Sequence, residues 1–210
     1  MREMTIKSAV KRATREEIIG VAISQFAQHG YDGVSMRSVA LGVGVTQAAL
    51  YYHFPDKQQL YLSAVKKAFL EQAETLKTIQ GRYRSAWEQL EGYIEGLTRL
   101  VAAESNYLRL MQWVLLDSDQ TRQRMLAEEV FKDTFTTLHA LIAELDPHHD
   151  AHLVAIMIFG MVLFPFQASV PRQFLPGHTP GQDDPVVLSR HVCDLLRKGL
   201  AKGPEKRTAP

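Results

Sequence analysis

One pattern constrains the fold of this chain more than any other feature. Residues that cap helices are followed by apolar residues at helical spacing. Thr14 with Glu17, and Ser85 with Glu88, have the capping-box form that opens helices. Behind the first pair, the apolar positions on one helical face are Ile18, Ile19, Ala22, Ile23 and Phe26. No alternation of period two persists along the chain, so strands are not expected. The pattern predicts an all-α fold.

Capping residues, glycines and prolines divide the chain into separate helices. We expect helices over residues 15–29, 36–41, 47–53, 86–103, 107–116, 119–145, 151–170 and 185–200. A longer helix follows Asp56 and carries Leu60, Ala64, Val65, Ala68, Phe69 and Leu76. The proline- and glycine-rich residues 171–185 are expected to form a loop. The apolar segments 107–116 and 151–170 are expected to be buried.

Composition places the chain among ordinary globular proteins. It has 210 residues, of which 46% are hydrophobic and 22% are charged, and Cys193 is its single cysteine. One cysteine cannot form an internal disulfide, so a reducing, cytoplasmic setting is expected. The longest apolar stretch, 153–166, is shorter than the ~20 residues that span a bilayer and contains Pro165. We therefore expect no membrane segment.

The charge is distributed unevenly along the chain. Residues 1–67 carry a formal charge of +4 and the remainder carries −3, within a net charge of +1. A basic front and an acidic body favour a polyanionic partner for the front. The first residues include Arg2, Lys7, Lys11 and Arg12, which either enter a minor groove or attract phosphates loosely as a frayed arm.

Residues 35–54 contain two short predicted helices joined by a glycine-containing turn, which is the helix-turn-helix arrangement. Ala40 is small where the two helices would cross, and Gly44 is free to adopt positive φ in the turn. The apolar residues that would fix the angle between the helices are Val39, Val45 and Leu50. Two short helices at this spacing also occur as a purely structural corner.

The second short helix presents a surface suited to DNA. Its exposed residues are expected to be Thr46, Gln47, Ala48, Tyr51, Tyr52 and His53. The Gln47 amide can pair with adenine through two hydrogen bonds, and Ala48 or Ala49 can contact a thymine methyl group. The expected phosphate contacts are Ser35, Arg37, Tyr51, His53 and Lys57.

The same region resembles a known family. Gly-Tyr-Asp-Gly-Val-Ser-Met-Arg at 30–37, Gly-Val-Thr at 44–46 and Leu-Tyr-Tyr-His-Phe-Pro-Asp-Lys-Gln-Gln-Leu at 50–60 are similar to the amino-terminal domain of TetR/AcrR-type transcriptional regulators. The resemblance implies that Tyr51, His53 and Lys57 contact phosphates and that residues 46–49 read bases. Ala48-Ala49 departs from the Gly-Thr or Pro-Thr of many members, which removes a hydroxyl group from this face.

The resemblance also implies a mechanism for the rest of the chain. Members are homodimers in which a ligand bound to a helical carboxy-terminal domain moves the DNA-reading helices. Residues expected to line a pocket for an apolar or aromatic ligand are Tyr107, Met111, Trp113, Phe131, Phe135, Met157, Phe159 and Phe164. Residues expected at the dimer interface, on the last two long helices, are Met157, Met161, Leu188, Val192, Leu195 and Leu196.

Other chemistry has weaker support in the sequence. His148 and His152 have a spacing compatible with a metal, but polar residues at a helix start are ordinary, and no metal or cofactor is expected. Catalytic motifs are missing, and His139 with Glu144 is a poor catalytic pair, so no catalytic residue and no enzyme activity are expected. Cys193 is expected to be buried and inert.

Taken together, the residues and the resemblance predict a flexible basic arm (1–13), a three-helix helix-turn-helix domain (14–60), a larger helical ligand-binding and dimerisation domain (61–202) and a disordered tail (203–210). The predicted function is a sequence-specific repressor, released from a pseudo-palindromic double-stranded DNA operator by a small-molecule effector. Alternatives are a transcriptional activator, a ligand-binding helical protein with vestigial DNA binding, and an all-α hydrolase or transferase.

Overall fold

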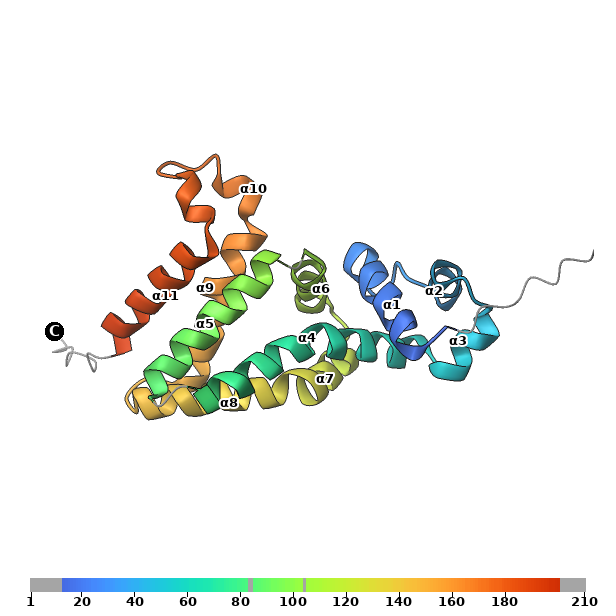
Figure 1. Cartoon of the computed structure of the whole chain (residues 1–210), viewed down its shortest axis with the longest axis horizontal. Helices are drawn as coiled ribbons and strands as arrows, with labels where there is room; N and C mark the ends of the chain where they lie inside the picture. The colour runs from blue at the N-terminus through green and yellow to red at the C-terminus, as the bar shows by residue number, and fades with distance from the viewer. Residues whose placement is uncertain (1–12, 83–84, 104, 201–210) are drawn as a thin grey trace, which may run out of the picture. The chain divides into compact units, whose positions relative to one another are not determined.

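The computed structural model describes the backbone of residues 13–82, 85–103 and 105–200, and the side chains of these residues apart from 70–73, 75–77 and 79–82. Within this part of the chain every regular element is a helix (Figure 1). The predicted all-α class is therefore confirmed. Residues 1–12 of the expected basic arm, the expected tail at 203–210 and the side chain of Leu76 lie outside the described residues.

The chain forms two compact units, Met1–Ala68 and Phe69–Pro210, which we call the amino-terminal and carboxy-terminal units. The division falls inside α4 (Lys57–Arg82). The boundary expected from the sequence, after residue 60, lies about two helical turns before this division.

Helix α1 (Arg15–His29) begins with the predicted capping box. The Glu17 backbone N–H donates to Thr14 Oγ1 at 3.2 Å, and the Thr14 N–H donates to Glu17 Oε2 at 2.8 Å. Ile18, Ala22 and Phe26 are buried on the inner face of the helix, as their spacing predicts. Local capping and helical periodicity together account for this element.

Helices α2 (Met36–Val43) and α3 (Gln47–His53) complete the short elements of the amino-terminal unit. The expected end of α2 at Leu41 is wrong, because the helix continues until Gly44 adopts a left-handed conformation with φ of 80°. After Pro55, Asp56 opens α4 by accepting a hydrogen bond from the Gln59 backbone N–H at 2.8 Å. Aspartate at this position satisfies a backbone donor of the first turn.

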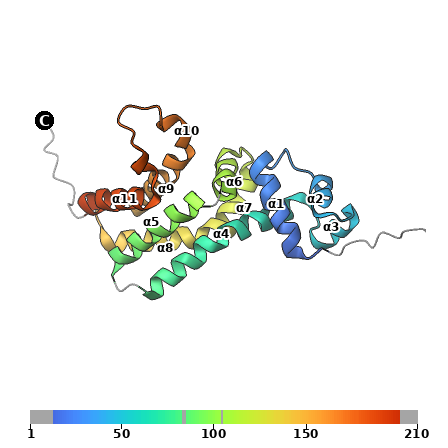
Figure 2. The same ribbon diagram turned by 45° about the horizontal axis from the view of Figure 1, so that its top comes forward.

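The carboxy-terminal unit has its core between long helices. Helix α5 (Ala86–Ala103) lies against α8 (Lys132–Leu145), α9 (Ala151–Gln167) and α11 (Pro185–Leu200), as Figures 1 and 2 show. Each helix contributes fully buried or nearly buried apolar residues, among them Leu90, Ile94, Leu138, Ile142, Ala155, Ile158, Val192 and Leu196. Helix α6 (Ser105–Leu116) begins two residues earlier than expected.

The expected single helix over 119–145 is interrupted. Helix α7 (Gln120–Leu126) passes into a π-helical turn, η1 (Ala127–Phe131), before α8 begins. A π-turn closes its hydrogen bonds one residue further along the chain than an α-turn. Apolar periodicity over the whole segment did not reveal the extra residue, because the period still fits the helix on each side.

The expected buried helix over 151–170 is wrong in two respects. Helix α9 ends at Gln167, and a separate short helix, α10 (Ser169–Arg172), follows it. The residues Leu153, Ile156, Met157 and Phe164 are exposed in the single chain. The predicted loop 171–185 also contains a short 3₁₀ helix, η2 (Pro180–Asp183).

No helix in the described ranges is both long and apolar enough to cross a bilayer.

Candidate nucleic-acid interface

The α2–α3 corner has the geometry of a helix-turn-helix. The Gly44 backbone N–H donates to the carbonyl oxygens of Ala40 at 3.0 Å and Leu41 at 3.1 Å, and the Val45 N–H donates to Ala40 at 3.0 Å. A left-handed residue after a helix is accommodated best by glycine. Ala40 is buried at the crossing, as expected. The chain can therefore reverse into α3 within a few residues.

Buried apolar residues hold α3 in place within the amino-terminal unit. Val39 and Leu50 are fully buried, and Val45 is half buried. Thr46 caps α3, because its Oγ1 accepts a hydrogen bond from the Ala49 N–H at 3.2 Å. The Thr46 oxygen therefore already accepts one hydrogen bond from the helix, and its hydroxyl proton and second lone pair can bond to another molecule.

The outer face of α3 is open to solvent. Gln47 and Ala48 are exposed, Tyr51 is 46% exposed and Tyr52 is 87% exposed. His53 is half buried, with its ring centroid 5.3 Å from that of Tyr52. The structure thus brings the residues expected to read bases onto one short helix with a buried opposite face.

Ser35 and Arg37 lie at the start of α2. The Ser38 N–H donates to Ser35 Oγ, and the Ser35 N–H donates to Ser38 Oγ, each at 3.0 Å. Ser35 and Arg37 are exposed. A helix start beside an exposed guanidinium group is suited to an anion.

Gln25 of α1 is a positioning residue that the sequence pattern did not reveal. Its Nε2 donates to the Ser38 backbone oxygen, and its Oε1 accepts from Ser38 Oγ, each at 3.0 Å. The two bonds tie the middle of α1 to the first turn of α2. A polar residue between the apolar positions of an amphipathic helix gives no sign of such a contact.

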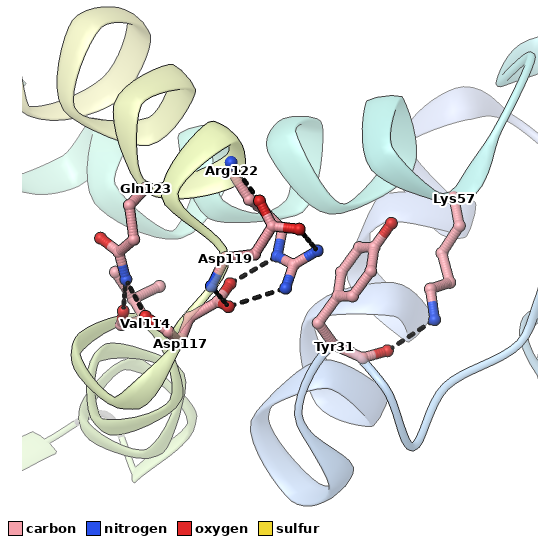
Figure 3. Close-up of polar contacts among 7 residues, drawn as sticks. All are labelled: Tyr31, Lys57, Val114, Asp117, Asp119, Arg122 and Gln123. Atoms are coloured by element: carbon pink, nitrogen blue, oxygen red, sulfur yellow. Dashed lines mark hydrogen bonds and ion pairs between the residues drawn. The ribbon is translucent and has the colours of Figure 1, made fainter.

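Lys57 does not extend freely toward solvent. Its Nζ donates to the carbonyl oxygen of Tyr31 at 2.8 Å and to that of Val34 at 3.0 Å. The same atom lies 4.1 Å from the centroid of the Tyr31 ring. The close-up in Figure 3 shows the bond to Tyr31. The phosphate contact that the resemblance implied for Lys57 therefore has to be weighed against these contacts with the protein's own backbone.

In the carboxy-terminal unit, part of the expected pocket forms an aromatic cluster. The Phe69 ring lies 4.6 Å from Tyr107 and 5.1 Å from Phe131 between centroids. Burial, together with the nearby Tyr93, raises the pKa of Tyr107 well above its ordinary value. Met111 is buried, and Phe135 packs against His152 with 5.1 Å between ring centroids. The ring centroid of Phe159 lies 6.4 Å from that of Tyr93.

The remaining expected pocket residues lie at the surface of the single chain. Trp113, Met157 and Phe164 are exposed. The sequence pattern could not separate them from the core residues, because an apolar side chain at helical spacing has the same signature whether another helix of the same chain or another molecule covers it.

The turn between α6 and α7 contains an ion-pair cluster that the sequence pattern did not indicate. The Arg122 guanidinium group donates to both carboxylate oxygens of Asp117 and lies 3.4 Å from Asp119 Oδ2 (Figure 3). Gln123 Nε2 donates to the backbone oxygens of Val114 and Asp117. The hydrogen bond from Arg122 lowers the pKa of the Asp117 carboxyl group.

The residues expected at a dimer interface divide into two groups. Met157 is 60% exposed and Leu195 is 56% exposed, while Met161 and Leu188 are half buried. Val192 and Leu196 are buried against the chain's own helices. A side chain already buried in its own chain has little surface left to offer a partner.

The histidines near the α8–α9 turn have local partners. His149 Nδ1 lies 2.7 Å from Asp146 Oδ2, and the His148 N–H donates to Asp146 Oδ1 at 2.8 Å. Among the residues that the structure describes, no group of three or more His, Cys, Asp or Glu side chains could hold a metal ion. Cys193 is half buried, and burial raises the pKa of its thiol to about 11.

Comparison with known proteins agrees with the helix-turn-helix geometry. The family of bacterial regulatory proteins, tetR family, matches residues 18–64. The biofilm operon icaADBC negative transcriptional regulator IcaR of Staphylococcus epidermidis is 25% identical over 167 residues, 76% of this chain and 86% of that protein. A probable acrEF/envCD operon repressor of Escherichia coli is 32% identical over 139 residues, 63% of this chain and 60% of that protein.

Solved structures share the fold of most of the chain. The transcriptional regulator FadR from Bacillus subtilis, in complex with stearoyl-CoA, superposes with a TM-score of 0.71 at 22% identity, covering 89% of this chain and 99% of that one. AibR in complex with isovaleryl coenzyme A and operator DNA gives 0.65 at 20% identity, covering 86% and 96%. The helix-turn-helix part of this chain, over residues 18–64, thus matches the tetR family of bacterial regulatory proteins, and the fold of the chain is shared by these solved regulators.

Proposed function

We propose that the protein is a homodimeric repressor that binds a pseudo-palindromic DNA operator and is released from it by a small apolar or aromatic ligand. The observation that carries the proposal is the exposed polar and aromatic face of α3, held by Leu50 and by the turn at Gly44. A recognition helix presents its first residues to base edges in the major groove. The names of both relatives, a negative regulator and a repressor, favour repression over activation.

The roles of individual residues follow from their positions. Gln47, with Thr46 and Ala48, is proposed to read bases, because these exposed residues occupy the cap and first turn of α3. Exposed or half-buried side chains around them are proposed to contact phosphates or sugars, namely Ser35, Arg37, Tyr51, Tyr52 and His53. Phosphate contacts set the register of the protein on the duplex, and base contacts select the sequence.

The proposed dimer forms through the exposed apolar face of α9 and its neighbour α11. Leu153, Ile156, Met157 and Phe164 lie along one stripe of α9, and Val187 and Leu195 are exposed on α11. An exposed apolar stripe of this kind is typical of a surface that another protein molecule covers. The two-fold symmetry of a homodimer would place two copies of α3 on the two halves of an operator.

The proposed ligand site lies near the cluster of Phe69, Tyr107 and Phe131. Three aromatic rings and the buried Met111 favour an apolar or aromatic molecule. Two solved structures of the same fold are complexes with acyl-CoA molecules, stearoyl-CoA in FadR and isovaleryl coenzyme A in AibR. An acyl-CoA ester joins an apolar acyl chain, which suits such a cluster, to a polar head, so acyl-CoA esters belong in the first panel of ligands.

Selection of DNA duplexes from a random pool tests the operator proposal. The enriched duplex and a random duplex of the same length are then titrated with protein across a salt series. We expect a pseudo-palindromic motif and a steep loss of affinity as salt rises, because phosphate contacts release counterions. An absence of any motif, together with a shallow salt slope, would contradict DNA regulation and support a ligand-binding protein with vestigial DNA affinity.

Competition experiments test the ligand proposal separately. Aromatic compounds, free fatty acids and acyl-CoA esters are added to the preformed complex with the enriched duplex, and its anisotropy is followed. Release by one class, with raised thermal stability of the free protein, is the expected result. If no compound releases the duplex or stabilises the protein, the ligand part of the proposal fails while the operator part stands.

A further inference from the structure

The ammonium group of Lys57 is held by the backbone of the turn between α1 and α2. It donates to Tyr31 O at 2.8 Å and to Val34 O at 3.0 Å, and both acceptors lie more than twenty residues earlier in the chain. It also lies over the Tyr31 ring, 4.1 Å from the centroid. A lysine that binds a phosphate does so through a compact charge at the end of a flexible side chain. Here the charge is fixed to the protein's own backbone.

The next turn of α4 contacts the Tyr31 ring through Tyr61. Tyr61 lies four residues after Lys57, on the same helical face. Its ring centroid is 5.1 Å from that of Tyr31 and 4.9 Å from that of Phe26, and both pairs meet edge to face. One face of α4 therefore contacts both the backbone and the ring of Tyr31.

The turn leaves no room for a side chain at Gly33. A Cβ atom built on Gly33 would lie 2.4 Å from the His29 carbonyl oxygen, far inside contact distance. Val34 is buried, and the next residue, Ser35, caps α2. Because the turn is confined between α1 and α4, its shape sets where α2 begins. Helix α2 in turn packs on α3.

We propose that Lys57 is a positioning residue, which holds the turn of residues 31–34 so that α2 and α3 meet DNA in the correct orientation, and that it is not a phosphate ligand. The inference rests on the proposed DNA-binding function and changes the role that the family resemblance implied for this residue. It predicts that removal of the Lys57 ammonium group damages recognition of sequence, while the electrostatic attraction to any duplex survives.

Charge-matched variants separate the two roles. Lys57→Met removes the ammonium group but keeps an unbranched side chain. Lys67→Met removes the same charge from the same helix at an exposed position, 3.9 Å from Glu16. Arg37→Ala supplies a reference for removal of a proposed phosphate contact. Each full-length variant is titrated with the enriched duplex and with the random duplex across a salt series, well below its own melting temperature.

We expect Lys57→Met to weaken binding of the enriched duplex about tenfold or more, the effect of one poorly matched base pair. Binding of the random duplex and the salt slope should match those of Lys67→Met. Equal weakening for both duplexes, with a salt slope shallower by about 0.9 per phosphate, would make Lys57 a phosphate ligand and overturn the proposal. A lower melting temperature with unchanged affinity would also overturn it, because the role would then be only structural.

Hydrogen exchange supplies a readout that needs no DNA. In Lys57→Met, the backbone amides of residues 34–38 should exchange faster than in Lys67→Met, with the middle of α1 unchanged. Equal exchange in the two variants would show that Lys57 does not hold the turn. If the wild-type protein enriches no duplex, the proposed function fails by itself, and the exchange result still decides whether Lys57 fixes the turn.

Discussion

At the scale of single residues, Gln47 offers the clearest test of base reading. Its side chain is exposed on the first turn of α3, so its truncation leaves the buried face of that helix intact. We expect Gln47→Ala to relax the preference at one position in each half-site, at a cost of ~1–3 kcal/mol. Repeating the duplex selection with the variant measures this. A uniform weakening at all positions would instead indicate a phosphate contact.

Asp117 makes stability depend on pH at the α6–α7 turn. The hydrogen bond from Arg122 lowers the pKa of this carboxyl group below its ordinary value of 3.8. A lowered pKa in the folded state stabilises the protein above the ordinary value, and this stabilisation is lost as pH falls through the lowered pKa. Asp117→Asn should therefore be less stable at neutral pH and should lose less stability than the wild type on acidification below about pH 4.

Urea unfolding from neutral to acidic pH measures the effect. The exposed Asp133→Asn serves as the control, and its free energy of unfolding should follow the wild-type pH dependence. Parallel curves for Asp117→Asn and the wild type would mean that the ion pair with Arg122 contributes nothing to folding.

At the scale of elements, two glycines of the amino-terminal unit should respond to alanine in opposite ways. Gly33 has the His29 carbonyl oxygen 2.4 Å from the position of a Cβ, so Gly33→Ala must displace the α1–α2 turn. Gly20 lies inside α1 with nothing within 4 Å of its Cβ position. Alanine in a helix interior is more favourable than glycine by roughly 0.5–1 kcal/mol.

We therefore expect Gly20→Ala to raise the melting temperature and Gly33→Ala to lower it. Gly33→Ala should also weaken binding of the enriched duplex, because the turn leads into α2. Thermal unfolding of the two variants beside the wild type checks the signs. A stabilised Gly33→Ala would indicate that the turn can move without strain.

Much of the fold follows from short-range signals in the sequence. The caps at Thr14, Ser35 and Thr46, with helical periodicity behind the first, predict where helices begin because each signal acts within a turn or two. The contacts of Lys57 and Gln25 could not be predicted in the same way, because their partners lie far along the chain. Similarly, the apolar character of residues 151–170 predicted a buried helix, and it gave no sign of which residues of α9 the chain itself would leave exposed.

At the scale of the whole molecule, association should depend on the exposed stripe of α9. A charge at Met157 would need to lose its water in any dimer formed through this stripe. We expect Met157→Glu to remain folded and become monomeric, with much weaker binding of the enriched duplex. Sedimentation velocity and helical circular dichroism measure the two properties.

Leu116→Glu is the matched control, since Leu116 is 76% exposed on α6 and outside the proposed interface. It should leave association unchanged. If Met157→Glu sediments like the wild type, the dimer forms through a different face. The positions of the two α3 helices on one operator would then follow from that face.

The π-turn over Ala127–Phe131 affects how this chain is aligned with other proteins. A residue added within a helix rotates everything before it by about 100° relative to everything after it. An alignment that carries α7 and α8 through as one uninterrupted helix therefore assigns side chains to the wrong face on one side of Phe131. Correspondences with any relative that lacks this π-turn need a one-residue gap inside a helix.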